Sequence, residues 1–294
     1  MELRTLRAFV EVVRQGGFSQ AAKTVFATQS TISKAVKQLE DEIGMTLLDR
    51  IGHTSRLTAA GEIVYRRAIR MLTERDDLLL ELDELRGLKR GALRLGLPPV
   101  GSSMVFAPLF ASYRQLYAGV DIRLVEYGGE RLQEAVQSGE IELAASLLPV
   151  SDGFEWQDVR REPLVALLPA GHELAARHVI NLAALKDMPF ILFETGFALN
   201  RVIRAACRRH GFEPSIAARS GQIDFILELA AAGLGIAFLP RMLAQQRPHP
   251  ALKPILLAEP EAQWHIAMIW RRGGYLSYAA RAWLELVRQQ GSKI

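Results

Sequence analysis

Cysteine is almost absent from this 294-residue chain, in which Cys207 is the only one. A single cysteine excludes an intramolecular disulfide and a cysteine-based zinc site. The six histidines, His53 among them, are scattered and include no pair at the i, i+4 spacing of a helical metal site. We therefore expect no metal site and no cofactor, and the low cysteine content is typical of a reducing cytoplasm.

Long apolar runs are also missing. The longest, residues 225–240, contains Glu228 and two glycines and is too short to span a bilayer. Arg7 and Glu11 interrupt the N-terminal segment where a secretory signal would be apolar. We therefore expect a soluble, cytoplasmic protein with no membrane partner.

The motifs of common enzymes are absent as well. The sequence has no phosphate-binding loop and no Gly-x-Ser-x-Gly nucleophile elbow. Gly233-Leu234-Gly235 precedes a predicted strand, whereas a dinucleotide-binding loop follows one. No poised acid, base or nucleophile can be nominated, so no enzyme is expected. A sugar- or acid-processing enzyme or a transport-type binding protein remains the alternative, and a DNA-binding assay discriminates between these classes and a regulator.

What is present begins with a basic N-terminal end. Residues 1–70 contain 11 Lys and Arg against 7 Asp and Glu, in a chain with a formal net charge of +4. Apolar residues recur there at helical spacing and predict a first helix that Gly16 ends: Leu3, Leu6, Val10 and Val13. Ser19 is expected to cap a second helix over residues 20–25, and residues 26–27 to form a turn.

A third helix follows, with Thr28 as its expected cap. One stripe of this helix is apolar and predicts its buried face: Ile32, Val36, Leu39 and Ile43. The other face carries short hydrogen-bonding side chains and two lysines: Gln29, Ser30, Thr31, Ser33, Lys34, Lys37 and Gln38. Hydroxyl and amide groups at a helix start can reach base edges, while lysines neutralise phosphates. The alternative is an ordinary solvated face.

The segment after the third helix predicts a wing. Gly44 ends the helix, and residues 47–58 form two short extended stretches around a glycine turn. Arg50, His53 and Arg56 would lie on this hairpin, where they can contact the DNA backbone or the minor groove.

The N-terminal residues resemble the LysR-type transcriptional regulators. The stretches that carry the resemblance are F-V-E-V-V-R-Q-G-G-F-S-Q-A-A, Q-S-T-I-S-K-A-V-K-Q-L-E-D-E-I-G and L-L-D-R-x-x-H-x-x-R-L-T-x-x-G. The resemblance implies a winged helix-turn-helix over residues 1–58 that binds double-stranded promoter DNA. It also implies tetramers, and it makes RNA polymerase a candidate partner.

This chain departs from the family pattern at several positions. Ser30 replaces a proline, Lys34 an arginine, Leu48 a phenylalanine and His53 a wing arginine. Lysine lacks the bidentate fork that arginine offers to guanine, and a histidine is mostly neutral at pH 7. We therefore predict a different base preference and wing contacts that are weaker and more sensitive to pH.

Residues 59–90 are predicted to form a linker. A helix over residues 59–86 carries a heptad seam that indicates a dimer: Val64, Ala68, Met71, Arg75, Leu78, Leu82 and Leu85. The alternative is a long helix packed on its own chain. Lys89 and Arg90 then form a short basic hinge.

Residues 91–294 alternate between strand-like and helical runs. This alternation predicts two α/β lobes, each a parallel sheet with helices on both faces, over residues 91–163 with 268–294 and over 164–267. Ligands of such sheets bind beyond the carboxyl ends of the strands. The candidate effector contacts lie in those loops: Gly101, Ser102, Ser103, Gly128, Gly129, Thr195, Phe197, Ser220 and Gln222. The alternative is that the serines are ordinary helix caps.

This half also resembles the effector-binding domain of LysR-type regulators, which is similar in fold to periplasmic solute-binding proteins. Ala231 to Pro240, A-A-G-L-G-I-A-F-L-P, carries that resemblance. The segments R-L-G-L-P-P-V-G-S-S and L-V-E-Y-G-G-E look like the CidR-like subgroup. That likeness implies a small carboxylic acid as effector and target genes of overflow carbon metabolism or cell lysis.

Overall fold

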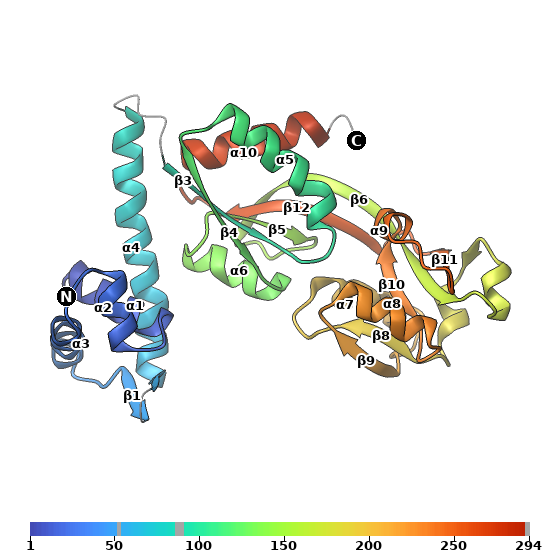
Figure 1. Ribbon diagram of the computed structural model, residues 1–294, viewed down its shortest axis with the longest axis horizontal. Helices are drawn as coiled ribbons and strands as arrows, with labels where there is room; N and C mark the ends of the chain where they lie inside the picture. The colour runs from blue at the N-terminus through green and yellow to red at the C-terminus, as the bar shows by residue number, and fades with distance from the viewer. Residues whose placement is uncertain (52–53, 86–90, 292–294) are drawn as a thin grey trace. The chain divides into compact units, whose positions relative to one another are not determined.

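The computed structural model describes residues 1–51, 54–85 and 91–291. Contacts divide the chain into two compact units, Met1–Arg90 with Gln137–Glu140 and Gly91–Val136 with Ile141–Ile294. The first unit consists of helices and one hairpin, and the second is built on mixed sheets (Figure 1). The predicted linker 59–90 therefore shares a unit with the predicted DNA-binding residues, and the predicted basic hinge at Lys89 and Arg90 lies outside the described residues.

The first unit follows the predicted order of elements. These are α1 (Leu3–Arg14), α2 (Phe18–Thr24), α3 (Gln29–Ile43), β1 (Leu48–Ile51), β2 (Thr54–Leu57) and α4 (Ala59–Leu85). Leu6 and Val10 are buried as predicted, but Leu3 is 44% exposed. Val13 is half-buried, and Phe9 and Val12, which lie outside the predicted stripe, are buried as well.

The predicted cap of α2 is wrong. The helix begins at Phe18 and Gly17 is its N-cap, so Ser19 already lies inside the first turn. The Ser19 hydroxyl donates instead to Oε1 of Gln29 at 3.1 Å. This hydrogen bond joins the start of α2 to the start of α3.

The second unit contains an extended sheet in the order β4-β3-β5-β12-β6-β11-β7, with β10 also paired to β6. Its first half is made of β3 (Gly91–Leu97), α5 (Ser102–Leu116), β4 (Val120–Glu126), α6 (Gly129–Ser138) and β5 (Leu143–Leu147), with the C-terminal α10 (Tyr278–Gly291). Helices α5 and α10 lie on one face of these strands and α6 on the other (Figure 1).

The second half of this unit carries the remaining elements. They are β7 (Val179–Ile180), β8 (Phe190–Phe193), α7 (Ala198–Arg209), β9 (Ile216–Ser220), α8 (Ile223–Ala231), β10 (Ala237–Pro240), α9 (Arg241–Gln246), β11 (Leu252–Leu257) and the 3-10 turns Glu173–Ala176 and Leu182–Leu185. Neither β7, β11, α9 nor the turns were predicted from the sequence. Buried apolar residues such as Phe190 and Phe238 fill the centre of this half.

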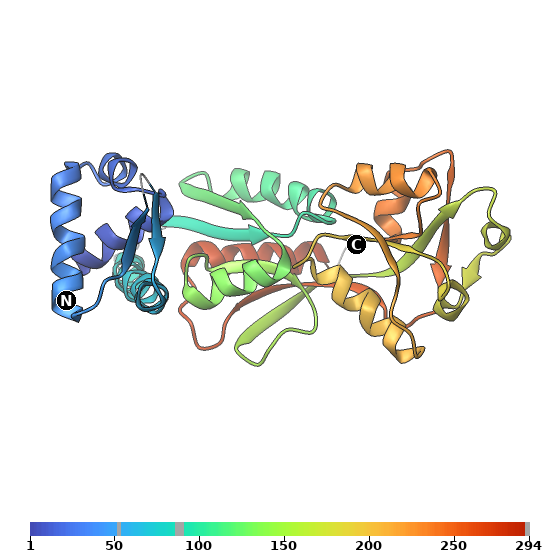
Figure 2. The same cartoon turned by 90° about the horizontal axis from the view of Figure 1, so that it is seen from below.

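Two long strands, β6 (Phe154–Pro169) and β12 (Gln263–Arg271), run through both halves (Figures 1 and 2). The residues of β12 pair with β5 on one side and with β6 on the other, and both pairings are antiparallel. The expectation of purely parallel sheets is therefore wrong, although β3 does pair in parallel with β4 and β5. The predicted lobe boundaries, 163/164 and 267/268, fall inside these two shared strands, and the division into lobes stays a prediction.

Candidate nucleic-acid interface and ligand cleft

The start of α3 is fixed by a hydroxyl cap. Oγ1 of Thr28 accepts the backbone N–H of Thr31 at 3.2 Å, as predicted for an N-cap. The hydroxyls of Ser30 and Thr31 lie 2.9 and 2.8 Å from the same oxygen. This cluster holds three hydroxyl groups at the N-terminal end of the helix, where unpaired N–H groups favour an anionic partner.

The two faces of α3 differ as the sequence predicted. Ile32, Val36 and Leu39 are buried against the rest of the first unit, and Ile43 is half-buried. The face that bears polar and basic side chains is exposed, apart from the half-buried Ser33: Gln29, Ser30, Thr31, Lys34, Lys37 and Gln38. Among the described residues, neither lysine ammonium has a carboxylate within 4.0 Å. Both charges are therefore available to phosphates.

The wing is a regular antiparallel hairpin. Strands β1 and β2 pair with Asp49 opposite Arg56 and with Arg50 opposite Ser55. Arg56 is exposed. The side chain of Arg50 and the whole of His53 lie outside the described residues, so their predicted contacts stay predictions.

A carboxylate that the sequence reading did not use joins α3 to the wing. Oε1 of Glu40 accepts the backbone N–H of Leu47 at 2.8 Å and that of Leu48 at 3.2 Å. These bonds fix the first strand of the hairpin against α3. Glu40 had no predicted role, because no local pattern in the sequence indicates a bond to residues seven and eight positions ahead.

The threonine and the glycine of the Leu-Thr-x-x-Gly sequence after the wing both have structural roles. Oγ1 of Thr58 accepts the N–H of Gly61 at 3.0 Å, and the Thr58 hydroxyl donates to the carbonyl of Thr46 at 2.8 Å. A Cβ at Gly61 would overlap the carbonyl oxygen of Leu47. Glycine is therefore required where the first turn of α4 passes the start of the wing.

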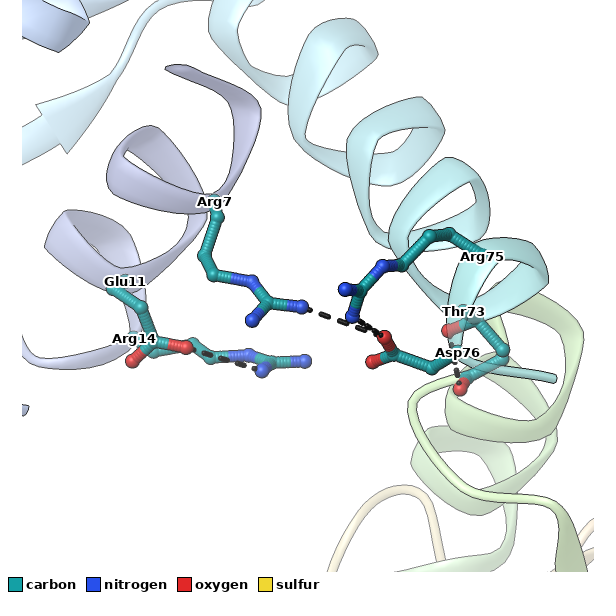
Figure 3. Close-up of polar contacts among 7 residues, drawn as sticks. Arg7, Glu11, Arg14, Thr73, Arg75 and Asp76 are labelled. Carbon is teal, nitrogen blue, oxygen red and sulfur yellow. Dashed lines mark hydrogen bonds and ion pairs between the residues drawn. The ribbon is translucent and has the colours of Figure 1, made fainter. Parts of the chain in front are cut away.

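The first part of α4 packs on its own chain. Ala68, Ile69 and Leu72 are buried in the core of the first unit. Beside them, Oδ1 of Asp76 lies 3.5 Å from Arg7 of α1 and 2.6 Å from Arg75 (Figure 3). All three side chains are substantially exposed, so these ion pairs add little to stability.

Apolar side chains remain exposed at three predicted seam positions of α4, two of them in its later part. Met71, Leu78 and Leu82 are 42%, 56% and 41% exposed. Contact with the same chain therefore accounts for the first part of the helix, and the dimer remains a prediction for the second part.

A small cleft lies in the second unit, where loops from its two halves meet. Its lining is almost wholly apolar: Pro98, Pro99, Val100, Gly128, Gly129, Ser146, Leu147, Phe197, Ala198, Leu199 and Trp264. Its volume of about 20 Å³ is enough for roughly one water molecule. A Cβ at Gly128 would lie 3.0 Å from the carbonyl oxygen of Gly196, so the loops from the two halves are in contact. The cleft is closed in this structure.

Three of the nine predicted effector contacts line this cleft, namely Gly128, Gly129 and Phe197. Gly101 lies beside it, because a Cβ there would meet the buried indole of Trp264 at 2.5 Å. Trp264, Ser146 and Leu147 were missed by the sequence reading because they lie within strands or at strand ends. Gln133 donates to the Ser146 hydroxyl at 3.2 Å.

The predicted serines and their neighbours serve other contacts. Ser102 is buried and donates its hydroxyl to the carbonyl of Pro98, whereas Ser103 is exposed. Oγ of Ser220 accepts the N–H of Gln222 at 3.0 Å, which is the geometry of a local turn before α8. Thr195 and Gln222 are exposed and lie outside the cleft lining.

The described residues offer no sign of metal or thiol chemistry. They contain no group of three or more potential metal ligands and no helix long and apolar enough to cross a bilayer. Cys207 is buried in α7, and this burial, with the nearby Glu213 carboxylate, raises the pKa of its thiol to about 11. The thiol is therefore protonated at neutral pH.

A capped helix with two lysines on its exposed face, a hairpin after it and a separate α/β unit with a closed cleft together form the architecture of a DNA-binding regulator with an effector domain. Residues 3–62 match the bacterial regulatory helix-turn-helix protein, lysR family, and residues 86–292 match the LysR substrate binding domain. The chain belongs to the LysR family of transcriptional regulators. Its sequence relatives are transcriptional regulators and not enzymes.

Two relatives illustrate the similarity. The uncharacterized HTH-type transcriptional regulator YwbI of Bacillus subtilis (strain 168) is 37% identical over 286 residues, which cover 97% of this chain and 95% of the relative. The HTH-type transcriptional regulator BudR of Raoultella terrigena is 32% identical over 281 residues, with 92% and 95% covered.

Solved structures share the fold over nearly the whole chain. A full-length OxyR variant from Pseudomonas aeruginosa superposes with a TM-score of 0.77 at 23% identity, covering 98% of this chain and 95% of that one. Full-length CbnR complexed with its target DNA has a TM-score of 0.66 at 23% identity, with 98% and 99% covered. The prediction of an N-terminal helix-turn-helix joined to a LysR-type effector domain is confirmed.

Proposed function

We propose that this regulator binds an operator in double-stranded DNA through the exposed face of α3. In this proposal Gln29, Ser30, Thr31 and Ser33 contact base edges, while Lys34, Lys37 and the wing residues Arg50, His53 and Arg56 contact phosphates. The observation that carries the proposal is the division of α3 into a buried apolar face and an exposed face with unpaired lysines. A helix of this kind fits the major groove.

The proposed unit of binding is a dimer formed through α4, and dimers pair into tetramers. Exposed Leu78 and Leu82, four residues apart on α4, support the dimer, whereas the tetramer rests on the resemblance to the family alone. In the proposed arrangement residues 1–58 read DNA, residues 59–90 link and dimerise, and residues 91–294 bind the effector. We propose that the regulator acts in the cytoplasm on chromosomal DNA. RNA polymerase is a candidate protein partner.

The proposed effector is a small organic acid held in the cleft of the second unit. Helix α6 begins at Gly129 in the cleft lining, and N–H groups in a first helical turn favour a carboxylate. The Ser146 hydroxyl offers another hydrogen bond, and the apolar walls suit a short carbon chain. Because the closed cleft has room for about one water, binding requires the loops at Gly128 and Gly196 to separate.

The test of DNA binding is fluorescence anisotropy with a duplex from the region upstream of the regulator's own gene. A scrambled duplex of equal length is the control. We expect tighter binding to the upstream duplex at physiological salt and weaker, salt-sensitive binding to the scrambled one. Equal affinity for both duplexes, or no binding at low salt, contradicts the proposal.

The test of the effector is a thermal-shift screen of short-chain carboxylic acids against matched amides. A ligand present at 100 times its Kd adds about 2.7 kcal/mol of stability. We expect one acid to raise the melting temperature while its amide does not. The assignment of a carboxylate is contradicted if an amide raises the melting temperature and its acid does not. It is also contradicted if no acid in the screen raises the melting temperature.

A further inference from the structure

Phe26 occupies an unusual position between α2 and α3. Its side chain is 99% exposed, the highest exposure among the large hydrophobic residues described. Its φ of 53° makes it the one non-glycine residue with positive φ in the described part of the chain. An apolar ring is therefore presented to solvent on a backbone conformation that side chains disfavour.

The backbone around Phe26 explains the positive φ. The N–H of Ala27 donates to the carbonyl of Ala22 at 2.9 Å, and the N–H of Phe26 donates to that of Lys23 at 3.3 Å. This pair of bonds is the Schellman motif that ends a helix, and it places Phe26 at the position where glycine is usual. A Cβ at this position shifts the folding equilibrium unfavourably by roughly tenfold relative to glycine.

The fold gains no packing from the ring in return. A fully exposed ring buries no apolar surface, and glycine would satisfy the same turn with less strain. A side chain that costs stability without packing indicates a contact made outside the chain. Phe26 lies two residues before the Thr28 cap, directly next to the exposed start of the proposed recognition face.

We propose that Phe26 contacts the operator and that its ring packs on the C5-methyl group of a thymine in the major groove. This inference rests on the proposed binding of DNA by α3. A phenyl ring has no hydrogen-bond donor for a phosphate or a base edge. The thymine methyl is the apolar group that the major groove presents, and phenylalanine is a side chain suited to it.

Two variants separate the ring from the turn. Phe26→Gly and Phe26→Asn both remove the ring and keep the turn. Glycine adopts a positive φ without strain, and asparagine tolerates it better than most side chains. Phe225→Ala, which removes an exposed ring of α8, is the matched control. We expect Phe26→Gly to raise the melting temperature while both Phe26 variants lose about 5- to 30-fold in operator affinity. The control should bind as the wild type does.

The thymine is identified by replacing each operator thymine in turn with uracil, which removes only the methyl group. Wild-type binding to the unmodified operator, measured first, tests the proposed function separately. We expect replacement of one thymine in each half-site to lower the operator affinity of the wild type several-fold. The same replacement should leave the operator affinity of Phe26→Gly unchanged. Equal uracil sensitivity in both proteins, unchanged affinity of both variants, or a changed oligomeric state in sedimentation overturns the proposal.

Discussion

The backbone of Gly61 passes so close to the carbonyl oxygen of Leu47 that any side chain at residue 61 would overlap that oxygen. The contact brings the first turn of α4 against the start of the wing, and Thr58 reinforces it with two hydrogen bonds. The geometry of the DNA-binding unit therefore depends on a glycine that has no chemical role.

Gly61→Ala should destabilise the first unit. The added methyl group must displace backbone, which costs about 1–3 kcal/mol in well-packed regions. Urea unfolding followed by circular dichroism measures the change. Gly119→Ala is the control, since a Cβ there meets nothing within 4 Å. Equal midpoints for the two variants would show that the close approach does not constrain the fold.

Glu40→Ala should loosen the wing, because it leaves the N–H groups of Leu47 and Leu48 without their acceptor. Loss of these bonds costs about 1–3 kcal/mol. Glu40→Gln should retain most of the stability, since an amide oxygen can accept both bonds. The free energy of unfolding of the three proteins checks this order. If glutamine proves as damaging as alanine, the negative charge of Glu40 matters more than its hydrogen bonds.

Leu78→Glu should dissociate the proposed dimer. The exposed stripe of α4 would have to bury a carboxylate in an apolar seam, where an unpaired charge is strongly unfavourable. Sedimentation equilibrium should show monomers at concentrations where the wild type is associated. Leu116→Glu, at another leucine that is 65% exposed, should leave association unchanged. Dissociation of both variants, or of neither, would contradict a dimer interface on α4.

The Cys207 thiol should be unreactive in the folded protein. Burial and the Glu213 carboxylate raise its pKa from 9.0 to about 11, so the reactive thiolate is scarce at pH 8. Because the raised pKa belongs to the folded state, the associated stability is present below pH 9 and is lost as the pH rises towards 11. A disulfide reagent at pH 8 should label the native chain far more slowly than the urea-unfolded chain. Equal rates would contradict the burial of this thiol.

Local signals in the sequence were sufficient for much of the DNA-binding unit. Thr28 caps the start of α3 and Gly44 ends the helix, as the sequence predicted. The buried and exposed faces between them follow from helical periodicity. The predicted cap at Ser19 was wrong because the helix that contains it, α2, is only seven residues long, and the boundaries of short helices depend on the surrounding packing.

The second unit was harder to predict, since its form depends on contacts between distant segments. Strand β6 is 16 residues long, and its first half pairs with β12 while its second half pairs with β10 and β11. No single periodicity covers such a strand. The cleft was found only in part for the same reason, because Trp264 reaches Gly101 through the fold and not through sequence proximity.

The most direct test of the account is the salt dependence of DNA binding by the wild type, Lys37→Ala and Gln29→Ala, on operator and scrambled duplexes. Lys37 is assigned to phosphate, so its loss should weaken binding to both duplexes and reduce the slope of log K against log salt by about 1. Gln29 is assigned to a base edge, so its loss should cost about 1–3 kcal/mol on the operator and leave the slope unchanged. Equal losses on both duplexes from both variants would contradict the assignment of α3 as the recognition helix.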